Sequence, residues 1–159
     1  MALNKVSEGE VDAAIRSNTL SVTGRPSWSI VAHKSWYRIV LPVTCPESLR
    51  TELRIVVGVN AIDPSKFSIT LFWHRTVRVR GLDFNGSHSN SHVNTEEWER
   101  RTHKHSWRDA CESEFAYTPT DITGRTVQEV FPEFCTECGI ACQAVLPELP
   151  PASMFNDDV

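Results

Sequence analysis

The chain lacks the segments that define several large classes of protein. No run approaches the roughly 18 consecutive apolar residues that a membrane span needs. The first residues, MALNKVSEGE, lack the apolar stretch of a secretory signal. A glycine-rich phosphate loop, a nucleophile elbow and a kinase signature are also missing. We therefore expect a cytoplasmic protein that makes no membrane contact and uses none of these three catalytic motifs.

An even set of cysteines is missing too, which argues against a disulfide framework. Five cysteines in a chain without an export signal are expected to stay reduced. Cys135, Cys138 and Cys142 have part of the spacing of a zinc knuckle, but no second Cys-x2-Cys pair completes it. We predict that they pack inside the fold and bind no metal. The acidic neighbours of Cys111 disfavour a thiolate, so a nucleophilic cysteine is not expected.

Basic residues are scarce in the last third of the chain. Residues 109–159 hold one basic residue, Arg125, against ten acidic residues, which gives a charge of −9. Residues 72–108 hold seven Lys and Arg, four Asp and Glu and five of the six histidines, which gives +3. The net charge of −4 argues against a general nucleic-acid coat. The segregation predicts a basic, histidine-rich surface and a separate acidic one.

The length and composition fit one ordinary globular domain. A chain of 159 residues that is 40% hydrophobic and 23% charged can bury a core without metal or disulfides. We expect an N-terminal helix and loop over residues 1–26 and an α+β domain over residues 27–142. Residues 143–159 are expected to form an acidic, flexible tail.

Hydrophobic periodicity predicts a helix followed by a series of strands. Ser7 and Glu10 form a capping-box pattern, so a short helix is expected over residues 8–17, with a loop from there to Pro26. The period then changes to two, which is typical of half-buried strands. These runs cover residues 27–33, 36–43, 53–59 and 67–73. Turn residues between them predict an antiparallel meander.

Two further strands are expected in the basic segment. Residues 76–82 alternate so that Arg78 and Arg80 fall on the same face of an extended strand. Asn85-Gly86 predicts a tight turn, followed by an exposed loop over residues 87–95. Residues 102–107 alternate again and predict a short strand.

A C-terminal helix is expected over residues 125–138. Thr123 is its expected cap, Pro132 an expected kink or break, and Gly139 its C-terminal stop. Together these elements predict an α+β fold. It consists of a single curved antiparallel β-sheet of five or six strands, with a short N-terminal helix and a C-terminal helix packed on one face.

Three short motifs resemble those of a known domain family. They are LDFNGSHSN, THKHSW and FPEFCTECGI, at residues 82–90, 102–107 and 131–140. They are similar to the LDxNGxxHxN, HxHxW and closing FxxFxxxxNI patterns of a small bacterial and prophage domain family, which is itself similar to TumE-type toxins. Gly139 stands where the family pattern has Asn. The resemblance implies a toxin-antitoxin or prophage setting, without implying one reaction.

The histidine spacing suggests acid-base chemistry on RNA. His103 and His105 stand two apart, so both imidazoles leave the same face of a strand, with Lys104 on the other. Such a pair can deprotonate a ribose 2′-hydroxyl and protonate the leaving 5′-oxygen, while arginines neutralise the phosphate. This predicts a metal-independent endoribonuclease without cofactors. Its acid-base set is His88, His103 and His105, and its RNA-binding set is Arg78, Arg80, Lys104 and Trp107.

The same segment also allows a metal site. His103 and His105, together with His88 or His92, can form a set of three imidazoles for zinc or another divalent ion. Asp83 would then be a further ligand or a hydrogen-bond partner of a ligand.

Two functions of different classes follow from these patterns. The first is a toxin-like ribonuclease or RNA-binding effector of a toxin-antitoxin module or prophage, whose partner is RNA or an antitoxin. The alternative is a non-enzymatic phage or mobile-element protein that binds and inhibits a host defence complex, as anti-CRISPR proteins do. That alternative would use the acidic last third of the chain against a basic channel.

Overall fold

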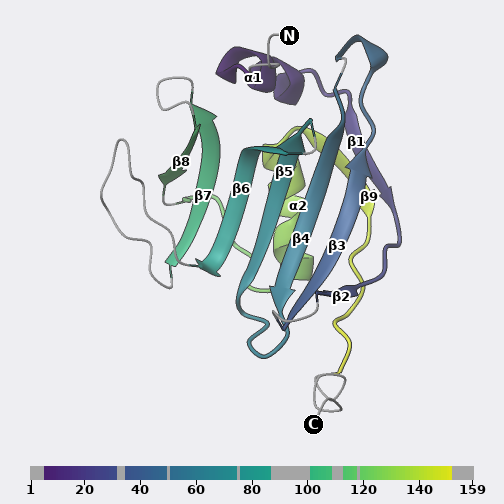
Figure 1. Ribbon diagram of the computed structural model, residues 1–159, viewed down its shortest axis with the longest axis vertical. Helices are drawn as coiled ribbons and strands as arrows, with labels where there is room; N and C mark the ends of the chain where they lie inside the picture. Colours follow the sequence, from purple (N-terminus) through teal and green to yellow (C-terminus); the bar gives the residue numbers. More distant parts are fainter. Residues whose placement is uncertain are drawn as a thin grey trace.

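A seven-stranded antiparallel sheet forms the centre of the fold (Figure 1). The structure is a computed structural model that describes residues 6–31, 35–49, 51–74, 76–86, 101–108, 113–117 and 119–151. Within these residues the strands of the sheet lie side by side in chain order. They are β2 (Ser29–Val31), β3 (Trp36–Val43), β4 (Leu53–Asn60), β5 (Phe67–Trp73), β6 (Val77–Gly86), β7 (Arg101–Arg108) and β8 (Ser113–Tyr117).

The two faces of the sheet differ in burial. Buried and half-buried side chains alternate along the whole of β4, as a strand with one covered face requires. The buried side of the central strands carries Ile39, Ile55, Val57 and Ile69, each at most 2% exposed. We call this side the inner face and the opposite side the outer face.

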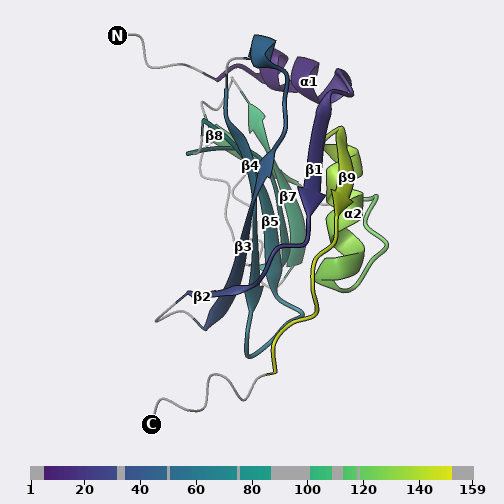
Figure 2. The ribbon, with the colours of Figure 1, turned by 90° about the vertical axis from the view of Figure 1, so that its right-hand side faces the viewer.

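Helix α2 (Val127–Glu137) and a small pair of strands cover the inner face (Figure 2). The helix packs there through an apolar stripe that includes Val130, Phe131 and Phe134. Beside it lies a parallel pair of strands, β1 (Leu20–Gly24) and β9 (Ile140–Ala144), which is separate from the main sheet. Helix α1 (Glu8–Arg16) lies at the end of this layer, and a 3₁₀ turn, η1 (Glu47–Leu49), joins β3 to β4. No helix of the described residues lies over the outer face, and none of them has the length and apolar character to span a membrane.

The predicted fold class is confirmed. The described residues form an α+β fold with an open antiparallel sheet, a short N-terminal helix and a C-terminal helix. The seventh strand is β8, which the sequence did not predict. Helix α1 begins after the predicted cap, Ser7, whose Oγ accepts a hydrogen bond from the backbone N–H of Glu10 at 3.1 Å.

Helix α2 forms where it was expected, with a different cap. Thr126, rather than Thr123, is the N-cap, and it forms a reciprocal capping box with Glu129. Thr123 lies outside the helix and donates from its backbone N–H and its hydroxyl to Glu133. The helix continues through Pro132, and Gly139 follows its C-cap with a φ of +63°. The predicted stop at Gly139 is therefore confirmed, whereas the predicted cap was three residues too early.

Two predicted loop segments are ordered instead. The expected loop from residue 18 to Pro26 contains β1, because Leu20 and Val22 fill buried positions beside β9. The expected tail from residue 143 begins as the end of β9, and Leu146 is 6% exposed. The carbonyl of Pro147 then accepts hydrogen bonds from the Trp28 indole N–H and the Gln128 amide. Residues 152–159 lie outside the described residues.

The predicted turn at Asn85-Gly86 is a β-bulge. Asn85 has a φ of 57°, as the turn chemistry suggested. Strand β6 nevertheless continues through Gly86, which pairs with Arg101 of β7. The register between Asp83 and Gly86 contains one extra residue on β6, which the left-handed backbone of Asn85 accommodates. The loop expected over residues 87–95 lies outside the described residues.

Candidate functional site

A row of arginine and aromatic side chains crosses the outer face. The register pairs Arg54 of β4 with Phe72 of β5, and Phe72 with Arg78 of β6, so the three are neighbours on that face. The guanidinium carbon of Arg54 lies 5.4 Å from the centroid of the Phe72 ring, which is cation–π distance. Arg38 of β3 is exposed on the same face. The described part of the outer face is therefore basic and partly aromatic.

Asp83, His103 and His105 form a cluster at one end of this face. The register places His103 opposite Asp83, with His105 two residues further along β7. Nε2 of His105 lies 2.7 Å from Oδ2 of Asp83, and Nε2 of His103 lies 3.3 Å from the same oxygen. The imidazole centroids are 4.8 Å apart, with the rings steeply inclined at 71°. Both rings therefore direct one nitrogen to a single carboxylate oxygen.

The cluster is buried behind a polar rim. The side chains of His103 and His105 are 0% and 1% exposed, whereas that of Asp83 is 23% exposed. Arg78 is 29% exposed, and its Nη1 lies 3.7 Å from Oδ2 of Asp83. Solvent therefore reaches the carboxylate and the guanidinium, while the imidazoles lie behind them.

Hydrogen bonds and positive charge keep Asp83 ionised. Burial alone would raise the pKa of this carboxyl, but hydrogen bonds from His103 and His105 oppose that effect. The charges of His105 and Arg78 act in the same direction, and the pKa of Asp83 falls well below its usual range. The cluster therefore has a carboxylate at its centre at neutral pH.

A glycine makes room for Arg78 beside the cluster. Gly81 lies opposite His105 in the register, and a Cβ atom there would be 3.5 Å from Cδ2 of His105 and 3.2 Å from Cδ of Arg78. A Cβ atom at this position would crowd Arg78 and make an ordinary contact with His105. Gly81 therefore leaves room for the Arg78 side chain.

Arg78 and Arg80 do not share a face, contrary to the prediction from strand alternation. They pair with Phe72 and Leu71, which are adjacent residues of β5 and so point to opposite faces. The β-bulge at this point leaves one extra residue on β6, and the alternation is reset. Arg78 stays beside the histidines, whereas Arg80 turns to the inner face and pairs with Asp12 of α1 at 2.7 Å.

Lys104 also lies on the inner face, as the alternation with its neighbouring histidines predicted. It is 2% exposed, and its Nζ lies 2.7 Å from Oδ1 of Asp121 and in a short contact with Glu137. Tyr117 donates a hydrogen bond to Glu137 at 3.1 Å. Lys104 thus forms a structural ion pair between β7 and the C-terminal segment, and the structure does not place it with the predicted RNA contacts.

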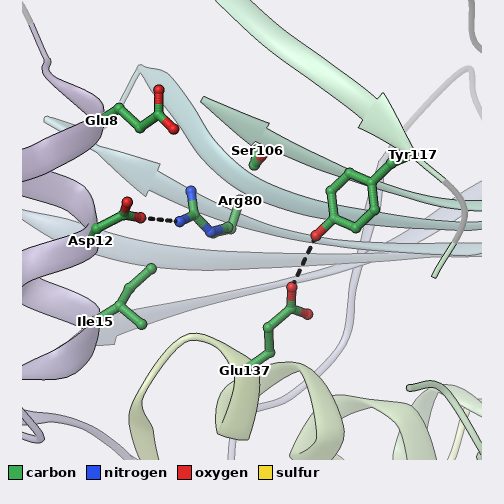
Figure 3. A pocket seen from close by; sticks show the side chains of 7 residues that line it. All are labelled: Glu8, Asp12, Ile15, Arg80, Ser106, Tyr117 and Glu137. Carbon is green, nitrogen blue, oxygen red and sulfur yellow. Dashed lines mark hydrogen bonds and ion pairs between the residues drawn. The ribbon is translucent and has the colours of Figure 1, made fainter. Parts of the chain in front are cut away.

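A polar cavity of about 290 Å³ lies between α1, α2 and the sheet. Figure 3 shows Asp12 meeting Arg80 across it and Tyr117 meeting Glu137. The hydroxyl of Ser106 is buried in its wall and has no hydrogen-bond partner among the described residues. Because Asp12 is paired with Arg80 and Glu137 with Lys104, this cavity is a weaker candidate for chemistry than the histidine cluster.

The remaining predicted residues divide into two groups. Trp107 belongs to β7, where it pairs with Glu114, but its side chain is outside the described residues. His88 and His92 also lie outside the described residues, as does Cys111, for which no nucleophilic role was expected. The contribution of His88 and His92 to a site therefore stays a prediction.

Two of the three clustered cysteines are buried in and beside α2. Cys135 and Cys138 are each 0% exposed. Burial raises the pKa of both thiols. Neighbouring thiols raise the pKa of Cys135 further, and the charge of Glu137 raises that of Cys138.

Among the described residues, Asp83, His103 and His105 are the one group of three whose ligand atoms approach closely enough to share a metal ion. All of these ligand atoms lie within 4.8 Å of one another.

The sequence predicted the two histidines but gave Asp83 only a secondary role. Strand alternation was enough to place His103 and His105 together. The central position of Asp83 depends on the pairing of β6 with β7, which no local pattern specifies. Arg54 and Phe72 were not predicted at all, because their proximity to Arg78 is set by register across three strands.

Comparisons with known proteins leave the site to be interpreted from its own geometry. No protein family matches the chain, and no curated protein and no solved structure matches it either. The fold and the cluster define an α+β domain with two imidazoles on one carboxylate, beside a basic sheet face. Such a cluster can move protons or hold a divalent ion.

Proposed function

We propose that the chain is a toxin-like effector that binds RNA on the outer face of its sheet and cleaves it at the Asp83–His103–His105 cluster. The observation that carries the proposal is the arrangement of the cluster, with both imidazoles on one carboxylate oxygen and Arg78 at its solvent-facing rim. The similarity of the three sequence motifs to a family resembling TumE-type toxins supports the same class.

The outer face has the chemistry that single-stranded RNA requires. Guanidinium groups bind phosphates, and an aromatic ring between them offers a stacking platform for a base. Arg54, Phe72 and Arg78 provide that sequence across three strands, and Arg38 lies on the same face in a separate row, opposite Gly58 of β4. A strand of RNA lying along this row would reach the cluster at its end.

Arg78 is the residue that connects binding to chemistry. Its ion pair with Asp83 places it at the cluster. A guanidinium at this position neutralises the charge that builds up on a phosphate during cleavage. The imidazoles lie deeper, so a substrate phosphate would meet Arg78 and Asp83 first.

The alternative, inhibition of a host defence complex through the acidic last third, has less support. Several of its acidic groups already have partners within the chain, although Asp121 and Glu129 are exposed. Asp121 and Glu137 pair with Lys104, Glu129 caps α2, and Glu133 accepts from Thr123 and Gly124. These carboxylates are less available to an external basic partner.

The matched pair Arg78→Gln and Arg80→Gln tests the proposal. The two residues lie on the same strand, carry the same charge and face opposite sides of the sheet. We expect Arg78→Gln to weaken RNA binding and to lower the slope of log K against log salt by about 0.7, the value for one single-strand phosphate contact. Arg80→Gln should leave binding unchanged while the protein is folded. Equal effects of the two substitutions, or no RNA binding by the wild type, would contradict the proposal.

A further inference from the structure

We infer that Asp83, His103 and His105 form a binding site for a divalent transition-metal ion, with zinc as the expected ion. This inference deepens the proposed function, because it names the cofactor of the same site. Metal binding is measured without RNA, so the two can fail independently.

The ligand atoms converge as a metal site requires. Ligands about 2.0–2.1 Å from a tetrahedral ion lie about 3.3–3.4 Å apart. The distance from His103 Nε2 to Asp83 Oδ2 is 3.3 Å, and the distance from His105 Nε2 to the same oxygen is 2.7 Å. Of these two pairs, the second has to open by about 0.6 Å for an ion to enter. The ligand atoms of the two imidazoles lie within 4.8 Å of each other.

The donor set matches a catalytic rather than a structural metal site. Two imidazoles and one carboxylate leave at least one coordination position for water or substrate. The exposed parts of Asp83 and Arg78 mark the side from which that position is reached. A phosphodiester bound there would place one oxygen toward the ion and another toward the guanidinium, and the ion would polarise the phosphoryl group.

Burial favours this role over direct proton transfer by the imidazoles. A general acid or base has to come within hydrogen-bond distance of the reacting oxygen. The side chains of His103 and His105 are almost completely covered, so a substrate oxygen would have to displace structure to reach them. Metal ligands need no contact with the substrate. The geometry therefore favours the metal alternative over the metal-free one.

The scaffold fixes the three ligands before any ion binds. Asp83 and His103 are direct partners across β6 and β7, and His105 follows on the same face of β7. Positioning on paired strands limits the rearrangement that binding requires.

Zinc titration of the full chain tests the inference. Chelator-treated wild-type protein should bind about one zinc ion per chain in calorimetry, and elemental analysis should confirm the ratio. Asp83→Asn and His105→Gln should each weaken the affinity by at least about 100-fold, since even outer hydrogen-bond partners of metal ligands contribute 10- to 100-fold. Circular dichroism shows whether each variant is folded, and Asp83→Asn keeps the volume of the side chain.

Two control variants distinguish this site from zinc binding elsewhere in the chain. His74→Asn removes a histidine that bonds Thr51 instead of the cluster, and it should leave zinc affinity unchanged. Cys135→Ser should also leave it unchanged. In the wild type, bound Co²⁺ should show the visible bands of nitrogen and oxygen ligands without a thiolate charge-transfer band. Loss of zinc in Cys135→Ser, equal affinity in Asp83→Asn, or no stoichiometric binding would overturn the inference.

Measuring zinc binding and RNA cleavage separately distinguishes failure of the proposed metal site from failure of the proposed ribonuclease function. A chain that binds zinc at the cluster but cleaves no RNA retains the metal site and loses the proposed function. Cleavage that persists in the chelator-treated, zinc-free chain retains the function and overturns the role of the ion as its cofactor.

Discussion

At the scale of single residues, strand alternation decides on which face of the sheet each charged side chain of β7 lies. His103 and His105 reach the outer face together, and Lys104 between them reaches the inner face, as the spacing predicted. The same rule failed for Arg78 and Arg80, because a bulge in β6 lies between them. A bulge is a property of the pairing with β5, so the sequence of β6 alone does not predict it.

Lys104 should therefore matter for stability rather than for RNA binding. Lys104→Met removes a nearly buried ammonium and leaves Asp121 and Glu137 without their partner. Breaking a fully buried pair costs about 3–5 kcal/mol, and the exposure of Asp121 lowers this to about 2 kcal/mol. Urea unfolding measures the change. A variant of unchanged stability that binds RNA more weakly would restore Lys104 to the RNA-binding set.

At the scale of elements, the two helices meet at a glycine. Gly139 follows the end of α2 with a φ of +63°, and a Cβ atom there would lie 1.9 Å from the carbonyl oxygen of Ile15 in α1. Asn also tolerates this backbone conformation, but its Cβ would not fit this contact. The glycine thus lets α1 approach the C-terminal end of α2.

Gly139→Ala should destabilise the fold strongly. The substitution combines a left-handed backbone, which costs about 1–2 kcal/mol for a residue with a Cβ, with overpacking of about 1–3 kcal/mol. We expect a loss of roughly 3 kcal/mol in the free energy of unfolding. Gly9→Ala in α1 is the control, because a Cβ there meets nothing within 4 Å and the helix gains propensity. Similar stabilities of the two variants would show that α1 does not dock against Gly139.

The buried thiols of α2 give an independent test of this packing. Cys135 and Cys138 should not react with Ellman's reagent at pH 8 while the protein is folded, because burial raises the pKa of both and blocks access. All five thiols should react in denaturant. Mass spectrometry of the labelled peptides identifies each cysteine. Rapid native labelling of Cys138 would contradict the described packing.

At the scale of the whole molecule, local patterns predicted the meander and the helices, and long-range pairing supplied the rest. The run of strands from β3 to β7 follows from period-two alternation and turn residues. The parallel pair of β1 and β9 joins segments 120 positions apart in the register, Leu20 with Ile140 and onward, and neither segment alone shows this partner. The candidate site likewise combines a predicted pair of histidines with an aspartate that the β6–β7 register places beside them.

The contacts of Pro147 decide where a C-terminal truncation should begin. Residues up to Pro147 contribute to packing through Trp28 and Gln128. A deletion that removes them would test stability as well as function. A chain ending at residue 151 keeps these contacts and removes the last eight residues, which include two acidic ones.

RNA cleavage by three proteins tests the central claim, that the outer-face cluster carries the activity. They are the full chain, the His103→Ala/His105→Ala double variant and the chain ending at residue 151. The account predicts that the double variant stays folded and loses about 100-fold or more in cleavage rate, because its proton carriers or metal ligands are gone. The truncated chain should cleave RNA at the full rate, since an acidic end repels RNA. Full RNA cleavage by the folded double variant would contradict the account.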